Sequence, residues 1–406
     1  MSACSSSDDT SAAGGTSGSA GSAGSAGRGG AAGSAGSTNV AGSGGSAGTA
    51  GSGVIIGVGG EGGAIGVAGA GGAAGEGGAG SATIEQNVAM ALLTSDQAGA
   101  VDTDANLINA WGLAINPVAE GGPLFWVSAA DKGVSAVIDA AGHPQSLVVT
   151  IPSANGTDPG SPTGQVYNGT PAFKGDVFIF ATEDGLITGW QTGTAAVTRV
   201  NHATTASYKG LAIVTNGTTP SLAAANFKAG TVDVFDTAYA AAVDTTLFTD
   251  PTMPAGFAPF NVAELGGKVY VTYAKQDAAK ADDVPAVGNG YVDMFGVDGT
   301  FTKRLISQGV LNSPWGLALS PDDWGSLPNA LLVGNFGDGL IHAYDPTTGE
   351  MLGELSTSGK ALAIDGLWAL SFGPNSASAN LSSQLFFTAG PVMETHGQFG
   401  KLTLNP

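Results

Sequence analysis

The sequence predicts an all-β fold, a six-bladed β-propeller with four-stranded blades, preceded by a disordered low-complexity N-terminal segment. Three observations lead to this prediction. A motif built on Trp-Gly-Leu-Ala recurs along residues 84–406, each copy is followed by short apolar stretches separated by polar turns, and no segment of this part shows the 3.6-residue periodicity of an amphipathic helix.

The repeated motif is clearest at residues 111–117 and 315–321, which read WGLAINP and WGLALSP. Weaker copies begin near residues 162, 209, 258 and 366. The steps between equivalent positions are 52, 46, 50, 56 and 52 residues, so one unit of nearly constant length occurs six times. A unit of this length with four short strands and turn residues between them is typical of a propeller blade.

Each motif copy is followed by an apolar stretch, a polar turn and a second apolar stretch, as in residues 124–139, 177–190 and 331–345. The sixth repeat ends after its third strand, at residues 399–404. We expect the segment before the first repeat, at about residues 86–93, to supply the missing outer strand, because pairing the two ends of the domain removes exposed sheet edges.

Residues 1–83 are nearly all Gly, Ala, Ser and Thr, with no aromatic residue and a single basic residue, Arg28. Such a segment has too little apolar surface to offset the entropy lost on ordering its backbone, so we expect a disordered tether. Its apolar run, residues 54–67, is interrupted by glycines and lacks the roughly 18 consecutive apolar residues of a membrane span.

The beginning of the chain, Met1-Ser2-Ala3-Cys4 followed by serines and aspartates, is similar to the end of a bacterial lipoprotein signal. In such signals small residues precede a cysteine that becomes lipidated. This reading makes Cys4 the attachment point of a lipid anchor and places the protein outside the cytoplasm, on the cell envelope or beyond it. The alternative is a chance cysteine in a low-complexity leader.

The composition excludes several kinds of partner and site. The formal net charge is −20, of which residues 84–406 carry −17, and a surface this acidic repels phosphate backbones, so nucleic acid is not expected as a partner. The single cysteine lies in the tether, which leaves the domain without disulfides or thiolate metal sites. We expect a monomer that meets a membrane only through the lipid anchor and whose charge is compatible with Ca²⁺.

Several stretches of residues 84–406 resemble a group of bacterial NHL-like propeller proteins. The matching stretches are NAWGLA at 109–114, FATEDG at 180–185, ANFKAGTV at 225–232, GFAPFN at 256–261, YAKQD at 273–277 and TAGP at 388–391. The resemblance implies a six-bladed propeller that is exported from the cytoplasm, and it implies no particular reaction.

The loops that enter each inner strand and the turns between second and third strands should share one face around the central channel. The longest of them, residues 274–290, is about ten residues longer than its equivalents, which suits a functional loop or a merely solvated one. We predict ligand contacts on this face from Lys209, Asn226, Lys275, Gln276, Asp277, Asn335 and Asp338. Lys209 stands where other repeats have tryptophan, and pairing with Asp365 is the conservative expectation.

The sequence signals for metal binding and for catalysis are weaker than those for ligand contacts. Asp102, Asp104 and Asn106 have the oxygen spacing of the start of a calcium loop but lack its glycine and its final glutamate, so a simple Asx turn competes with a loose Ca²⁺ site. Further carboxylate candidates are Asp282 and Asp283. Glu394 and His396 could form an acid–base pair, although a polar turn explains them as well.

The sequence therefore favours a propeller, not clearly an enzyme, that binds a small molecule or a protein on its loop-rich face. One alternative is a Ca²⁺-dependent enzyme, lactonase-, hydrolase- or lyase-like, with its metal site at the central channel; another is a structural surface protein. Convergence of Asp104, Asn226, Asp277 and Asn335 would favour the enzyme. The aromatic residues of the inner strands, Trp111, Phe260, Trp315 and Trp368, are expected to serve packing.

Overall fold

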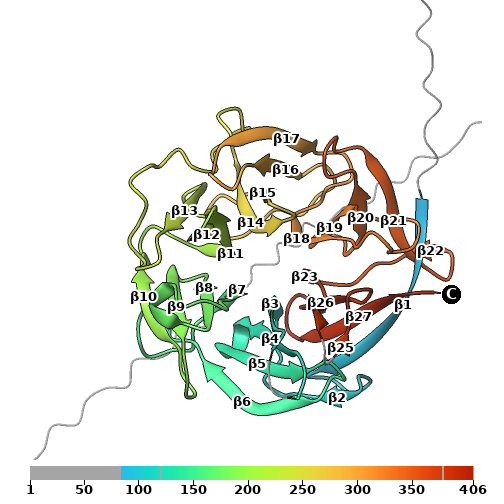
Figure 1. The fold of residues 1–406 in the computed structure, drawn as a ribbon, viewed down its shortest axis with the longest axis horizontal. Helices are drawn as coiled ribbons and strands as arrows, with labels where there is room; N and C mark the ends of the chain where they lie inside the picture. The colour runs from blue at the N-terminus through green and yellow to red at the C-terminus, as the bar shows by residue number, and fades with distance from the viewer. Residues whose placement is uncertain (1–83, 119–120, 377–378, 406) are drawn as a thin grey trace, which may run out of the picture. The chain divides into compact units, whose positions relative to one another are not determined.

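Six blades of antiparallel strands surround a common centre in the computed structural model, which describes residues 84–118, 121–376 and 379–405 (Figure 1). The predicted all-β propeller is therefore confirmed. Cys4 and the predicted tether lie outside the described residues. No helix within the described part of the chain is long and apolar enough to span a membrane.

The first three blades follow one another in chain order, each with its first strand nearest the centre. Blade 1 contains β3 (Ala110–Asn116), β4 (Leu124–Ala129), the 3-10 turn η1 (Ala130–Lys132), β5 (Val134–Asp139) and β6 (Pro144–Thr150). Blade 2 contains β7 (Pro162–Tyr167), η2 (Phe173–Gly175), β8 (Phe178–Thr182), β9 (Leu186–Trp190) and β10 (Val197–Asn201). Blade 3 contains β11 (Tyr208–Asn216), β12 (Thr219–Asn226) and β13 (Thr231–Phe235).

The last three blades complete the ring. Blade 4 contains β14 (Phe257–Leu265), β15 (Lys268–Lys275), β16 (Gly290–Phe295) and β17 (Phe301–Ser307). Blade 5 contains β18 (Pro314–Leu319), β19 (Leu331–Asn335), β20 (Ile341–Tyr344), β21 (Met351–Thr357) and the short β22 (Lys360–Ala361). Blade 6 contains β23 (Leu367–Phe372), β26 (Leu385–Ala389) and β27 (Gln398–Leu404), with the short β24 (Asn375–Ser376) and β25 (Ala379–Asn380) between β23 and β26.

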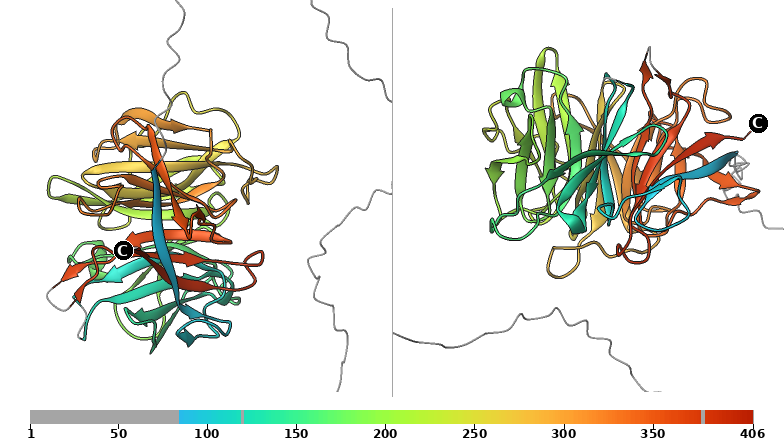
Figure 2. Two further views of the ribbon diagram at one scale, coloured as in Figure 1. Left: turned by 90° about the vertical axis from the view of Figure 1, so that its right-hand side faces the viewer. Right: turned by 90° about the horizontal axis from the view of Figure 1, so that it is seen from below.

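The first described strand, β1 (Ile84–Ser95), lies along the outside of two blades (Figure 2, left). From Val88 to Ser95 it pairs antiparallel with β27 and so provides the outer strand of blade 6. Its first four residues pair in parallel with β21 of blade 5. The short strand β2 (Asp102–Thr103) pairs with the end of β1 before the chain enters blade 1. One strand thus joins the two ends of the domain and also bridges two neighbouring blades.

Blade 3 has three strands within the described residues, whereas blades 1, 2 and 4 have four. The segment that follows β13 turns immediately, because the Asp236 carboxylate accepts hydrogen bonds from the Ala238 and Ala240 backbone N–H groups, at 2.8 Å each. Only a short contact with β13 remains, in which the Ala242 N–H donates to the Val234 carbonyl at 2.8 Å. The outer edge of this blade is therefore covered by an irregular loop.

Glycines in the repeated motif let neighbouring inner strands come close together. A Cβ atom at Gly112 would lie 2.2 Å from the Thr163 carbonyl oxygen, and one at Gly164 would lie 2.6 Å from the Leu211 nitrogen. Both contacts are with backbone atoms of the next blade, which cannot move aside as a side chain can. The glycine of the motif is thus required by the spacing of the blades around the centre.

Candidate functional site

Aromatic side chains from the inner strands close the central channel. Trp111 stacks on Trp368 with 3.7 Å between ring centroids, and Trp315 meets the edge of Trp111 at 6.5 Å. Phe336 stacks on the other side of Trp368 at 4.0 Å, and Phe260 lies 5.9 Å from it. We call these five residues the aromatic plug. The four inner-strand residues serve packing, as predicted, and Phe336 joins them from the turn that follows β19.

Lys209 lies directly above the aromatic plug, near the start of β11, with 3% of its side chain exposed. Its Nζ forms an ion pair with the Glu183 carboxylate, lies 3.6 Å from Asp282 Oδ1 and sits 5.3 Å from the centre of the Trp111 ring. Burial lowers the pKa of Lys209, but the neighbouring carboxylates, Glu183 foremost, outweigh burial and raise the pKa above its ordinary value. The amine is therefore held in its charged form.

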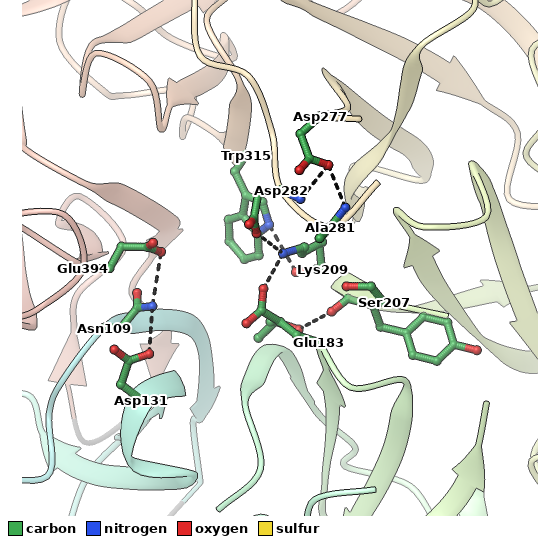
Figure 3. Close-up of polar contacts among 12 residues, drawn as sticks. Asn109, Asp131, Glu183, Ser207, Lys209, Asp277, Ala281, Asp282, Trp315 and Glu394 are labelled. Carbon is green, nitrogen blue, oxygen red and sulfur yellow. Dashed lines mark hydrogen bonds and ion pairs between the residues drawn. The ribbon is translucent and has the colours of Figure 1, made fainter. Parts of the chain in front are cut away.

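The predicted pairing of Lys209 with Asp365 is wrong. Asp365 Oδ2 instead accepts a hydrogen bond from the Val392 backbone N–H at 2.8 Å. Lys209 instead forms ion pairs with Glu183, in the turn between β8 and β9, and with Asp282, in the long loop of blade 4. Both segments reach the centre on the loop-rich face, as Figure 3 shows.

The long loop between β15 and β16 is held in place by its own polar residues. Asp277 Oδ1 accepts hydrogen bonds from the N–H groups of Ala281 at 2.9 Å and Asp282 at 3.4 Å, so Asp277 shapes the loop. Gln276 Nε2 donates to the Phe227 carbonyl at 2.5 Å and ties the loop to blade 3. Asp282 is thereby positioned over Lys209, whereas the side chain of Lys275 points into solvent.

Asp283 follows Asp282 but faces a different environment. Its Oδ2 atom is buried and has no hydrogen-bond partner among the described residues. Burial raises the pKa of Asp283, and Lys209 opposes that rise only in part. The two adjacent aspartates therefore do not act as one pair of exposed metal ligands.

A left-handed turn brings Glu394 into the site from blade 6. Three consecutive non-glycine residues, Val392, Met393 and Glu394, have φ angles of 56°, 54° and 64°. Left-handed backbone costs an L-residue roughly 1 kcal/mol or more, so this turn stores strain. Glycine would adopt these angles without that cost, and strain of this kind concentrates at sites where a side chain must be held in place.

The turn directs the Glu394 carboxylate towards Asn109 and leaves its neighbours in solvent. Asn109 Nδ2 donates to Glu394 Oε1 at 3.2 Å and approaches Asp131 Oδ1 at 3.5 Å (Figure 3). The Oδ1 atom of Asn109 accepts a hydrogen bond from the indole N–H of Trp368. Burial raises the pKa of Glu394 to about 7; Glu183 adds to the rise, and the hydrogen bond from Asn109 opposes it. Glu394 therefore changes its charge near neutral pH.

Four carboxylates and one amine thus meet above the aromatic plug. We call this group the acidic mouth; it consists of Lys209 with its partners Glu183 and Asp282, and of Glu394 and Asp131, which both contact Asn109. Glu394 makes no ion pair among the described residues, since its only side-chain hydrogen bond is the one from Asn109. The arrangement can accept a cation beside Glu394.

The predicted acid–base pair of Glu394 and His396 is not formed. His396 Nδ1 lies 2.8 Å from Asp96 Oδ2 and 3.0 Å from Gln97 Nε2, in a network that joins the end of β1 to β27. The left-handed turn separates the two side chains, because Glu394 turns inwards to Asn109. His396 contributes to ring closure, and Glu394 to the acidic mouth.

Two predicted ligand contacts are structural. Asn226 and Asn335 occupy equivalent positions at the ends of β12 and β19. Their amide oxygens accept the backbone N–H groups of Ser207 at 3.3 Å and Asn312 at 3.1 Å, which fixes the loop entering each inner strand. Asp338 accepts from the Asn312 side chain at 3.1 Å and from Asn335 at 3.5 Å, so it supports the same loop in blade 5.

The predicted calcium ligands also contact neighbouring protein groups. Asp104 Oδ1 accepts hydrogen bonds from both the backbone and the side-chain nitrogen of Asn106, at 2.9 Å each, which is an Asx turn. Asp102 lies 3.4 Å from His143 Nδ1 instead of joining them. Over residues 84–118, 121–376 and 379–405, no three His, Cys, Asp or Glu side chains form a group that could hold a metal ion. The convergence of Asp104, Asn226, Asp277 and Asn335 that would favour the enzyme alternative is not formed, since each of them hydrogen-bonds to loop residues of its own blade.

Three residues of the site are absent from the predicted set, namely Asn109, Asp131 and Glu183. Asp131 and Glu183 occupy the turn between second and third strands in blades 1 and 2, and each stands two residues before a glycine. Asn109 immediately precedes the inner strand of blade 1. Alignment of the six repeats, with attention to acidic residues at this turn, would have identified the two carboxylates.

Comparison with known proteins gives relatives along most of the chain. A protein of Acanthamoeba polyphaga mimivirus, described as uncharacterised, is 30% identical over 323 residues, covering 75% of this chain and 76% of the relative. A second protein of the same virus, with the same description, is 29% identical over 334 residues, covering 77% and 84%. No family model matches the chain.

Solved structures with a similar fold have little sequence in common with this chain. A glucose dehydrogenase has a TM-score of 0.52 at 11% identity, covering 78% of this chain and 100% of that structure. The soluble aldose sugar dehydrogenase of Escherichia coli, in its apo form, has a TM-score of 0.50 at 12% identity, covering 79% and 100%. At these identities the likeness concerns the propeller fold alone.

Proposed function

We propose that this chain, which belongs to the same family as the mimivirus protein that is 30% identical to it, is a binding propeller that captures a cationic group at its acidic mouth. The ligand carries an ammonium or guanidinium group. The single observation that supports this function is Glu394, a carboxylate that a strained turn holds inwards and that forms no ion pair among the described residues.

The charge balance of the site favours a cation. Lys209 is shared between Glu183 and Asp282, which leaves Asp131 and Glu394 without a basic partner among the described residues. Like charges this close repel one another, and a bound cation removes that repulsion. The net charge of −20 also attracts cationic ligands from a distance.

Binding fits the arrangement better than catalysis does. The predicted acid–base pair would need both groups near one reacting atom, and Glu394 and His396 point into separate networks. The remaining carboxylates of the mouth are fixed by Lys209 or lie at its rim. A site of this kind holds a charged group in place without an evident means of breaking a bond.

Glu394→Gln should weaken the binding of ethylguanidinium by about tenfold or more, because a charge-assisted hydrogen bond contributes about 1.5–3 kcal/mol. Isothermal titration of the full chain measures this, with N-ethylurea as a neutral probe of similar shape that should bind poorly to both proteins. Glu350→Gln, which removes an exposed carboxylate elsewhere on blade 5, is the matched control and should leave the affinity unchanged. Equal affinity of the native and Glu394→Gln proteins would contradict the proposal.

The pH dependence of the affinity for ethylguanidinium provides a second test. Only the ionised carboxylate attracts the cation, and the pKa of Glu394 is raised to about 7, so affinity should increase as the pH rises from 6 to 8. The Glu394→Gln protein should show a flat profile over this range. A native profile that is equally flat would mean that Glu394 is not the group that receives the cation.

We also propose that the protein acts outside the cytoplasm, held to a membrane by a lipid on Cys4. The support is the sequence around Cys4 and the tether composition described above. In cells that produce the native protein, Cys4→Ala should move it from the membrane fraction to the soluble fraction, as measured by fractionation and immunoblotting. Cys4→Ser is a second variant with the same expectation. Membrane association that persists in both variants would refute the anchor.

A further inference from the structure

A cavity lies in the central channel, on the other side of the aromatic plug from the acidic mouth. Its volume is about 310 Å³, and all six inner strands contribute to its wall. Trp315 and Ala369 close its inner end, and the later residues of each inner strand surround it. The lining includes residues 113–115, 164–167, 211–213, 261–264, 317 and 370.

The wall of this cavity is formed by six free strand edges. Each inner strand is the terminal strand of its sheet and has a hydrogen-bonded neighbour on its outer side only, so its second edge faces the channel. Every second residue on such an edge presents its N–H and C=O groups away from the sheet. These groups need partners, because unpaired backbone polar groups are costly when they are shielded from water.

Near the plug the neighbouring blades supply those partners. Gln165 Nε2 donates to the Gly112 carbonyl at 2.8 Å, Thr163 Oγ1 donates to the Tyr208 carbonyl at 2.8 Å, and Asn261 Nδ2 donates to the Trp315 carbonyl at 2.8 Å. Each of these bonds crosses from one blade to another. They form a belt that satisfies the strand edges around the narrowest part of the channel.

Beyond this belt the inner strands lack such side-chain partners for their backbone groups. Among the described residues, no side chain hydrogen-bonds to the backbone of residues 113–115, 166–167, 211–213 or 317–319. Most side chains here are aliphatic, such as Leu113 and Ile213, and they pack between the blades instead of filling the channel. Glu264 is a charged residue of the lining. The cavity therefore offers backbone donors and acceptors in all directions around its axis.

We propose that this cavity is a binding site for a small, uncharged molecule rich in hydroxyl groups, of the size of a six-membered ring carrying several of them. Hydroxyl groups both donate and accept, so they match alternating N–H and C=O groups without a fixed orientation. Ligand sites commonly have volumes of about 300 Å³ and above, which agrees with the cavity found here. The site is independent of the acidic mouth, from which the aromatic plug separates it.

The test compares myo-inositol with cyclohexanol, which has the same ring but a single hydroxyl group. Saturation-transfer NMR and titration of the full chain should show binding of myo-inositol, with an affinity on the order of a hundredfold higher than that for cyclohexanol, because each additional hydrogen bond contributes about 1 kcal/mol. Equal or stronger binding of cyclohexanol, or no binding of myo-inositol, would overturn the proposal.

Variants at the cavity wall locate the binding site. Ala263→Phe places a ring at a half-buried lining position and should abolish myo-inositol binding, whereas Ala263→Ser should preserve it. Retained ethylguanidinium binding would show that the Ala263→Phe protein is folded. Glu394→Gln should leave myo-inositol binding intact. Loss of myo-inositol binding in Glu394→Gln, or its persistence in a folded Ala263→Phe protein, would place the ligand elsewhere and contradict the assignment.

Discussion

Replacing Gly164 with alanine is expected to destabilise the propeller by about 3 kcal/mol, the upper part of the range for overpacked cores. The added Cβ would lie 2.6 Å from the Leu211 nitrogen and 2.9 Å from two atoms of Gly210. All three atoms belong to the backbone of the neighbouring inner strand. That strand can move away only by widening the gap between blades 2 and 3, and the ring is closed on itself.

Equilibrium unfolding of the full chain in urea measures this loss. Gly169→Ala is the matched control, because its added Cβ would meet only the side chain of Tyr167, at 3.2 Å or more, in an exposed loop. The control should change the free energy of unfolding by less than about 1 kcal/mol. If Gly164→Ala were as stable as the control, the close approach of inner strands would not be what requires glycine in the motif.

Lys209→Met is expected to cost about 1–3 kcal/mol of stability, less than the loss of one partner from a fully buried ion pair, because Glu183 and Asp282 remain in contact with water. The methionine side chain fills similar space, so the loss comes from charge. Glu183 would keep its carboxylate beside Asp282 and Glu394 with no cation of the chain between them. Removal of this positive charge should also raise the pKa of Glu394 further, because Lys209 now lowers it.

Thermal unfolding of the Lys209→Met protein should therefore respond to added cations. Ethylammonium can occupy the space left by the lysine amine, and it should raise the melting temperature of this variant more than that of the native protein. Lys228→Met, which removes an exposed lysine on the same blade, is the control and should be close to native in stability. A Lys209→Met protein as stable as this control would show that the ion pair is not needed to hold the mouth together.

The fold could be predicted because its signal is repeated six times. A single Trp-Gly-Leu-Ala stretch has little meaning, but six copies at nearly equal steps fix the number of blades and the position of each inner strand. The three-stranded form of blade 3 depends on a local detail, the capping of two backbone N–H groups by Asp236. Strand propensity in the sequence does not predict these hydrogen bonds.

The site was predictable only in part. Lys209 and Glu394 stand out in the sequence, one because it replaces an aromatic residue of the repeat and the other because it lies in a polar turn. Their partners depend on which loops meet over the channel, and that is a property of the closed ring. Asn226 and Asn335 were misassigned for a related reason, since a polar side chain that fixes a loop has the same composition signal as one that binds a ligand.

The outer strand of blade 6 has a consequence for the order of events during synthesis. Ser95, at the end of β1, hydrogen-bonds to Gly397, which lies 302 residues later in the chain. Residues 88–92 of β1 must therefore wait for their partner strand β27 to leave the ribosome, while blades 1 to 4 can form as they emerge. Closing so long a loop is slow, and during this interval the waiting edge is exposed to other chains. Chaperones that shield strand edges should be needed most in this late interval, and mutations in β1 should reduce the yield of folded protein more than mutations in β6 or β10.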